Sequence, residues 1–191
     1  MILSVGDAVA NEVVQGELGW WTVKGRLDML RLMYYAKLTK EQSDVVRGVY
    51  ECGRSRADAG RQNTWCAYTK KLLGELGLEE EWRSGEVGEM SEWRKRVSAR
   101  IHDREQREWR SRMVGKSTLM RYQRIKRLRR EKFLRTAGWA VKRLVRLRGG
   151  VERLEVVRGR RFQIRRQDRR CLVCTGGEVE DEDTSLTDVL H

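Results

Sequence analysis

Proline is absent from this sequence of 191 residues. Average usage of about 5% would give about nine or ten prolines in a chain of this length. Because proline breaks helices and stiffens linkers, we expect helices without proline breaks and no polyproline spacers. The 18 glycines must therefore supply the turns and the helix ends.

Long hydrophobic runs are absent as well. No stretch approaches the roughly 20 apolar residues that span a bilayer, and residues 1–5 lack the basic and apolar regions of a secretion signal. We therefore expect no membrane contact and a nuclear or cytoplasmic protein that is not secreted. In that setting the four cysteines are expected to be reduced thiols or metal ligands rather than disulfides.

A recognisable active site is also missing. No Ser/His/Asp set, no carboxylate pair in a glycine-rich cleft and no phosphate-binding loop can be assembled from the sequence. Residues 115–118 (GKST) imitate the end of a P-loop, but the first glycine of that motif would fall at Arg110. A predicted helix rather than a strand also precedes it. We expect Ser117 or Thr118 to cap a helix instead, and we expect no enzymatic activity.

Acidic residues are scarce in one part of the chain. Residues 91–170 carry 29 Lys and Arg against 8 Asp and Glu, whereas residues 1–90 hold 12 against 14 and residues 171–191 hold none against 6. A globular fold gains nothing from packing like charges together. Nucleic acid is the commonest partner for such a surface, because its phosphates offset the repulsion and release counterions. The charge pattern therefore predicts an RNA or DNA partner.

Apolar spacing in the first part of the chain predicts helices, and the fold is expected to be mainly α. One stripe at helical spacing comprises Val23, Leu27, Leu30, Tyr34 and Leu38. Residues suited to N-caps precede three predicted helices at Thr22, Ser43 and Asn63. Glycines are expected to end the second and third helices at Gly53 and Gly77. Residues 1–82 form an N-terminal helical part, and a linker at 83–91 marks the domain boundary.

The second part, residues 91–170, is predicted to hold long basic helices in a helical bundle. A helix from Ser91 places five apolar residues on one side: Trp93, Val97, Ile101, Trp109 and Met113. Its charges alternate in sign at i,i+4 spacing, which is typical of a solvated, salt-bridged face. Residues 116–148 differ, because thirteen Lys and Arg accompany a single acid, Glu131. We expect two basic helices there, broken near Gly138.

Ten basic residues are the candidates for binding the nucleic acid backbone, because no pairing within a helix can neutralise them. They are Arg121, Arg124, Lys126, Arg127, Arg129, Arg130, Lys142, Arg143, Arg146 and Arg148. Apolar residues between them still give each predicted helix an inner side. The alternative interpretation is a surface that merely keeps the protein soluble.

The C-terminal residues show two weaker patterns. Alternating apolar residues predict a small β-hairpin at 153–165, and the acidic tail at 171–191 is expected to be disordered. Cys171 and Cys174 have the spacing of two zinc ligands, but a structural zinc site needs four. No cofactor is therefore established from the residues, and zinc is the only candidate.

Two stretches together resemble a known protein family. RLVRLRGGVERLEVVRGRRF (143–162), followed by RRCLVCTGGEVEDED (169–183), is similar to the region after the polymerase domain in reverse transcriptases of LINE-type, non-LTR retrotransposons. GELGWWTVKGRLDMLRLMYYAKL (16–38) and STLMRYQRIKRLRREKFL (117–134) resemble the helical part of the same region. The similarity is diffuse except at the cysteine motif.

The resemblance implies a zinc knuckle and basic helices that engage template RNA and target DNA. Cys171 and Cys174 match the first two ligands of that knuckle, whereas its His and last Cys would fall near Thr184 and Val189. The chain thus departs from the family after Asp183, and the polymerase domain is missing.

Three functions remain open at this stage. The first is a non-catalytic nucleic-acid-binding fragment related to the retrotransposon region. The second is a decayed retroelement remnant with no selected activity. The third is a helical protein-interaction module that uses the apolar stripes of residues 20–76. The oligomeric state is not indicated by any pattern.

Overall fold

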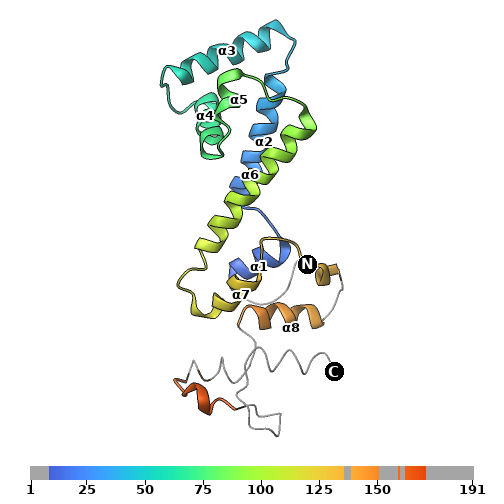
Figure 1. Cartoon of the computed structure of the whole chain (residues 1–191), viewed down its shortest axis with the longest axis vertical. Helices are drawn as coiled ribbons and strands as arrows, with labels where there is room; N and C mark the ends of the chain where they lie inside the picture. The colour runs from blue at the N-terminus through green and yellow to red at the C-terminus, as the bar shows by residue number, and fades with distance from the viewer. Residues whose placement is uncertain (1–8, 136–138, 151–158, 160–161, 171–191) are drawn as a thin grey trace. The chain divides into compact units, whose positions relative to one another are not determined.

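The computed structural model describes residues 9–135, 139–150, 159 and 162–170 (Figure 1). The described residues are mainly helical, which confirms the predicted fold class. The chain packs as two compact units: a terminal unit of residues 1–20 and 109–191, and a central unit of residues 21–108. The predicted linker at 83–91 falls within the central unit. Most of the predicted hairpin and the whole tail lie outside the described residues.

The central unit is built from five helices. They are α2 (Val23–Leu38), α3 (Asp44–Asp58), α4 (Trp65–Glu75), α5 (Glu79–Ser84) and α6 (Met90–Ser111), and the division between the units crosses α6 after Glu108. Helices α2 and α6 run side by side in opposite directions (Figure 1), since Leu32 pairs with Trp93 and Thr22 pairs with Glu105. None of the described helices is both long and apolar enough to cross a membrane.

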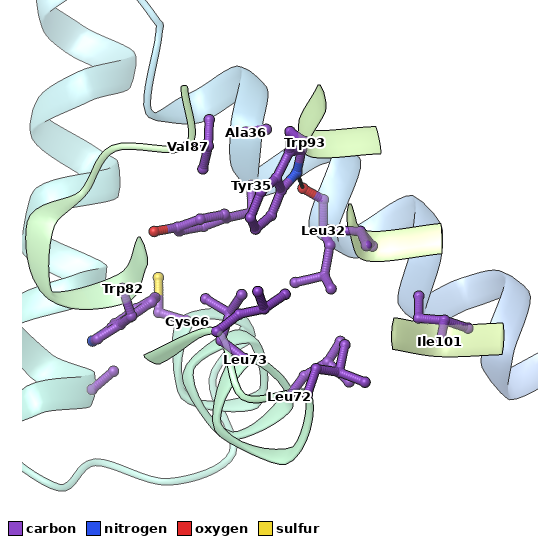
Figure 2. Close-up of a cluster of buried hydrophobic side chains, with 14 of the residues drawn as sticks. Leu32, Tyr35, Ala36, Cys66, Leu72, Leu73, Trp82, Val87, Trp93 and Ile101 are labelled. Carbon is purple, nitrogen blue, oxygen red and sulfur yellow. Dashed lines mark hydrogen bonds between the residues drawn. The ribbon is translucent and has the colours of Figure 1, made fainter. Parts of the chain in front are cut away.

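Aromatic rings form the centre of the core in the central unit (Figure 2). The ring of Tyr35 stacks on Trp82 with centroids 6.0 Å apart, and Trp93 lies against it at 6.2 Å. Their polar atoms are satisfied, because the Tyr35 hydroxyl donates to the Glu81 carbonyl at 2.7 Å and Trp93 Nε1 donates to the Leu32 carbonyl at 3.1 Å. Buried rings whose polar ends are paired contribute strongly to a core of this size.

The apolar side predicted for the long helix is confirmed. All five of its residues are at most 1% exposed: Trp93, Val97, Ile101, Trp109 and Met113. The last of these lies just beyond the end of α6 at Ser111. Because charged residues flank this stripe on both sides, the helix can bury only the stripe. The spacing of the apolar residues was therefore sufficient to predict the buried side.

The apolar stripe predicted for α2 is wrong. Four of its members are more than half exposed: Val23, Leu27, Leu30 and Tyr34. Helix α2 instead buries the face that carries Gly25, Asp28, Leu32, Tyr35 and Ala36. Small residues permit close packing there, since a Cβ on Gly25 would lie 2.6 Å from Glu105 Oε1. Because a charged residue, Asp28, is buried on this face, the hydrophobic pattern of the sequence does not indicate the face. Arg104 neutralises the Asp28 carboxylate at a distance of 2.6 Å.

Helix α3 begins after Ser43 as predicted but continues through Gly53 to Asp58. The prediction that Gly53 ends it is wrong, because this glycine serves packing: a Cβ there would lie 2.9 Å from Cys66 Sγ of α4.

The caps of α4 differ slightly from the prediction. Thr64 rather than Asn63 caps the start of this helix, and its hydroxyl accepts a hydrogen bond from the Ala67 amide at 3.1 Å. Gly77 follows the C-cap residue Leu76 with φ +67°, a left-handed conformation that glycine adopts readily.

The terminal unit contains short elements in place of the predicted long basic helices. They are α1 (Asn11–Leu18), the 3₁₀ turn η1 (Ser117–Leu119), α7 (Met120–Ile125), η2 (Lys132–Arg135), α8 (Trp139–Arg148) and η3 (Arg166–Asp168). Residues 126–131 are not helical. Lys116, not Ser117 or Thr118, stands at the N-cap of η1. Closely spaced like charges disfavour a continuous helix. The contacts with α1 that are described below also fix residues 126–131 in a non-helical conformation.

Helix α1 lies against two rings of the terminal unit. Trp109 Nε1 donates to the Glu12 carbonyl at 2.8 Å, and the Tyr122 hydroxyl donates to the Val13 carbonyl at 3.2 Å. Gly16 allows this approach, because a Cβ there would lie 2.6 Å from both the Trp109 ring and the Tyr122 hydroxyl oxygen. Val13 also packs near Gly149, which follows α8.

Candidate nucleic-acid interface

Residues 124–130, here called the arginine segment, carry four exposed arginines: Arg124, Arg127, Arg129 and Arg130. The segment begins in α7 and leaves the helix at Lys126, whose φ of −98° and ψ of 140° are extended. Lys126 and Leu128 point inward, each 1% exposed. Buried and exposed side chains thus alternate, as they do along an extended chain.

The end of helix α1 holds the backbone of the arginine segment. Gly19 caps α1 with φ +63°. A Cβ there would overlap the Arg130 amide nitrogen and lie 2.7 Å from the Arg129 carbonyl carbon, so only glycine fits. The Glu131 amide donates to the Glu17 carbonyl at 3.1 Å. The arginine segment is therefore fixed through its main chain, and its exposed guanidinium groups are not needed for that attachment.

A buried ionic cluster lies beneath the arginine segment. It consists of Glu17, Lys126, Glu131 and Arg148, so its two cations balance two carboxylates. Lys126 Nζ is 2.5 Å from both Glu131 Oε1 and the Arg129 carbonyl oxygen. Arg148 Nε is 3.3 Å from Glu17 Oε1 and its Nη2 is 3.9 Å from Glu131 Oε1. The cluster links α1, the arginine segment and α8.

The pKa values of the two carboxylates in the ionic cluster are shifted in opposite directions. Burial raises the pKa of Glu17, which is fully buried, although Arg148 and Lys126 act against this rise. The hydrogen bond from Lys126 lowers the pKa of Glu131, which is partly exposed. Desolvation thus dominates at the first carboxylate and pairing at the second.

Two of the ten candidate residues belong to the fold rather than to a surface. Lys126 is 1% exposed and cannot reach a phosphate. The Arg148 guanidinium lies over the rings of Tyr122 and Phe133, with its carbon 5.9 and 5.6 Å from their centroids. Lys116, which precedes η1, also pairs with a carboxylate of α1, Glu12, at 2.8 Å.

The other candidates differ in position. Lys142 and Arg143 are exposed on α8, and Arg143 and the half-buried Arg146 make further interactions within the chain. Arg121 lies in α7. Cys171 and Cys174 lie outside the described residues, so zinc binding stays a prediction. Within the described residues no group of three or more His, Cys, Asp or Glu side chains could hold a metal ion.

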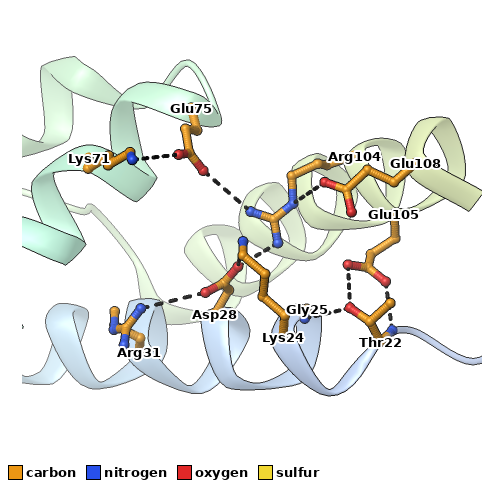
Figure 3. Close-up of polar contacts among 10 residues, drawn as sticks. All are labelled: Thr22, Lys24, Gly25, Asp28, Arg31, Lys71, Glu75, Arg104, Glu105 and Glu108. Carbon is orange, nitrogen blue, oxygen red and sulfur yellow. Dashed lines mark hydrogen bonds and ion pairs between the residues drawn. The ribbon is translucent and has the colours of Figure 1, made fainter. Parts of the chain in front are cut away.

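A separate polar cluster in the central unit is centred on Arg104 and Asp28 (Figure 3). Arg104 contacts Asp28 at 2.6 Å, Glu108 at 3.8 Å and Glu75 at 3.9 Å. Lys24 also contacts Asp28, at 2.9 Å. These pairs join α2, α4 and α6, and the Arg104 side chain is only 9% exposed.

Sequence reasoning missed the residues that organise the interface: Glu12, Glu17 and Gly19. A weak signal was present, because two acids, Glu12 and Glu17, lie close before Gly19 in the sequence. Nothing in the sequence, however, indicated that helix α1 would contact residues more than 100 positions later.

Comparison with known proteins adds no relationship. No protein-family model matches the chain, no curated protein matches it, and no solved structure matches it. The kinship with the C-terminal region of LINE-type reverse transcriptases therefore stays a prediction from the sequence resemblance.

Proposed function

We propose that this chain is a non-catalytic protein that binds the phosphate backbone of RNA or DNA. The carrying observation is the arginine segment, whose main chain is attached to α1 while Arg124, Arg127, Arg129 and Arg130 are exposed. Lys142 and Arg143 of α8 are further exposed cations of the terminal unit.

The chemistry of the segment suits phosphates rather than base edges. Guanidinium groups pair with phosphate oxygens in a bidentate manner, and each neutralised phosphate releases condensed counterions. A backbone that is already fixed loses little conformational freedom on binding. The segment is short and extended, so it does not present a helix that could enter a groove of the nucleic acid. We therefore expect little sequence preference and a Kd on the order of 10⁻⁴–10⁻⁶ M at physiological salt.

The proposal is tested by fluorescence anisotropy with labelled single- and double-stranded oligonucleotides across a salt series. Log K should fall linearly with log salt, and each lost phosphate contact should lower the slope by about 0.9 for duplex DNA and about 0.7 for single strands. The double variant Arg127→Gln and Arg130→Gln should weaken binding to every sequence alike.

A matched control removes the same charge from the central unit. Arg94→Gln with Arg100→Gln changes two exposed arginines of α6 and should leave both affinity and slope nearly unchanged. Equal losses in the two double variants would show that net charge alone attracts the oligonucleotide. An affinity of the wild type that ignores salt would refute backbone binding.

We further propose that the chain derives from the post-polymerase region of a LINE-type retrotransposon reverse transcriptase. The support is the resemblance of residues 143–162 and 169–183 and the basic character of the terminal unit. On this proposal Cys171 and Cys174 are remains of a zinc knuckle. Metal analysis of purified protein with and without Cys171→Ser tests that part.

A further inference from the structure

Trp20 is an exposed tryptophan at the edge of the terminal unit. Its side chain is 42% exposed, whereas the other tryptophan side chains that the structure describes are buried or half-buried. Tryptophan is highly buried on average in folded proteins, because its large ring gains most from leaving water. An exposed indole ring in a unit that carries a surplus of cations therefore calls for an explanation beyond the packing of the core.

Trp20 directly follows the residue that holds the arginine segment. Gly19 lies against the backbone of Arg129 and Arg130, so that a Cβ on Gly19 would overlap the Arg130 amide nitrogen and lie 3.0 Å from the Arg129 Cα. Consecutive Cα atoms are about 3.8 Å apart. The backbone of Trp20 is therefore one peptide unit away from this contact, and both belong to the terminal unit.

Two hydrogen bonds with Gln15 hold the backbone of Trp20. The Trp20 amide donates to the Gln15 carbonyl at 3.1 Å, and Gln15 Nε2 donates to the Trp20 carbonyl at 3.0 Å. Arg112 Nη2 donates to Gln15 Oε1 at 2.7 Å and so fixes the Gln15 side chain in turn. A ring on a backbone that is already fixed loses little conformational freedom when a ligand covers it.

An indole ring beside several arginines suits one class of ligand. The exposed guanidinium groups of Arg127, Arg129 and Arg130 suit phosphates, and the indole offers a flat aromatic face. Bases within a duplex already stack on one another, so only unpaired bases can turn towards a side chain. A single strand offers both phosphates and free base faces, and stacking tolerates any sequence because every base has a π-face.

Given the phosphate binding proposed above, we propose that Trp20 and the arginine segment form one site for single-stranded nucleic acid. Trp20 stacks on an unpaired base while the arginines pair with neighbouring phosphates. The site therefore prefers single strands to duplexes of the same length. The arginines supply the part of the affinity that depends on salt. Trp20 supplies a part that salt hardly changes, because stacking releases no condensed counterions.

The base contact is tested on the wild type by fluorescence anisotropy with a labelled oligothymidylate. The matched probe has the same length and the same phosphates but carries abasic sugars throughout. The wild type should bind the abasic probe about 10-fold more weakly, which is the loss expected for one stacked base. Log K should fall with log salt at the same slope for both probes. This measurement requires no variant and so does not depend on how a variant folds.

Two substitutions assign the loss to Trp20. Trp20→Leu should bind the oligothymidylate about 10-fold more weakly and should bind the abasic probe and a duplex as the wild type does. Trp20→Phe keeps an aromatic ring and should retain most of the affinity. The control Tyr68→Leu removes a ring that is 51% exposed in the central unit and should bind every probe like the wild type.

Three results would overturn the proposal while leaving phosphate binding intact. Equal wild-type affinities for the oligothymidylate and the abasic probe would exclude stacking. Wild-type affinity of Trp20→Leu for the oligothymidylate would place a stacked base on another ring. An equal loss by Trp20→Leu for all three probes would show that Trp20 only supports the arginine segment. A wild type that binds no probe at any salt concentration would refute this proposal and the proposed function together.

Discussion

At the scale of single residues, exposure divides the cations of the terminal unit into two groups. Lys126 and Arg148 serve the fold, because they neutralise Glu17 and Glu131 within the ionic cluster. Arg127 and Arg130 lie close by in sequence but face solvent. Sequence alone cannot separate these groups, since one of the two carboxylates, Glu17, comes from a helix more than 100 residues earlier.

The first prediction concerns Lys126. Lys126→Met should lower the free energy of unfolding by on the order of 3 kcal/mol. The substitution leaves Arg148 as the only cation of the cluster to neutralise two carboxylates. Urea unfolding followed by circular dichroism measures this loss. Lys142→Met removes the same charge from an exposed site and should change stability by less than about 0.5 kcal/mol. Equal effects would contradict a structural role for Lys126.

The second prediction concerns acid. The pKa of Glu131 is lowered in the folded chain from its usual value of 4.5 by the hydrogen bond from Lys126. A lowered pKa means that the stabilisation is present above about pH 4.5 and is lost as the pH falls through the folded pKa. The stability gap between wild type and Lys126→Met should therefore narrow below pH 4.5. Urea midpoints at several pH values measure it, and a gap that widens in acid would refute the pairing.

At the scale of elements, the contact between α1 and the arginine segment decides whether the interface forms. The third prediction is that Gly19→Ala weakens nucleic acid binding without changing charge. A Cβ at Gly19 costs about 1–2 kcal/mol for the left-handed backbone, and it also overlaps the Arg130 amide and displaces the segment.

A second glycine provides the control for this substitution. Gly115 also has a positive φ, +82°, but no atom lies within 4 Å of the position its Cβ would take. Gly115→Ala should carry the backbone cost alone and keep its affinity for an oligonucleotide. Anisotropy and thermal melts on both variants separate the two effects. Unchanged binding by Gly19→Ala would show that the segment does not need α1.

Elements also show how far the sequence could predict the fold. The apolar side of α6 was predictable, because Trp93, Val97 and Ile101 stand out among charged neighbours. The buried side of α2 was not, because Gly25 and Asp28 lie on it while Val23, Leu27 and Leu30 remain exposed. The departure in α2 follows from two tertiary contacts, Glu105 against Gly25 and Arg104 against Asp28, which periodicity does not encode.

At the scale of the whole molecule, charge is divided unequally between the two units. The terminal unit holds 23 Lys and Arg against 13 Asp and Glu, whereas the central unit holds 18 against 15. The surplus of Lys and Arg over Asp and Glu in residues 91–170 is thus concentrated in the unit that carries the arginine segment.

The fourth prediction follows from this division. A polyanion should stabilise the terminal unit and raise its melting temperature, by a free energy of about 2.7 kcal/mol at a ligand concentration of 100 Kd. Circular dichroism and calorimetric melts with and without an oligonucleotide measure the shift. The Arg127→Gln, Arg130→Gln variant should show a smaller shift. A melt without any cooperative transition would favour a decayed remnant over a maintained protein.

Helix α1 contacts residues of its own unit that lie more than 100 positions later in the chain, and this has a kinetic consequence. Val13 accepts a hydrogen bond from Tyr122, 109 residues later. A ribosome therefore releases α1 long before its packing partners exist, while residues 21–108 can already complete their core. Contacts so far apart close slowly, so pulse-labelled amide exchange during refolding should protect α2 and α6 ahead of α1. Simultaneous protection of all three helices would show that the chain matures in one step.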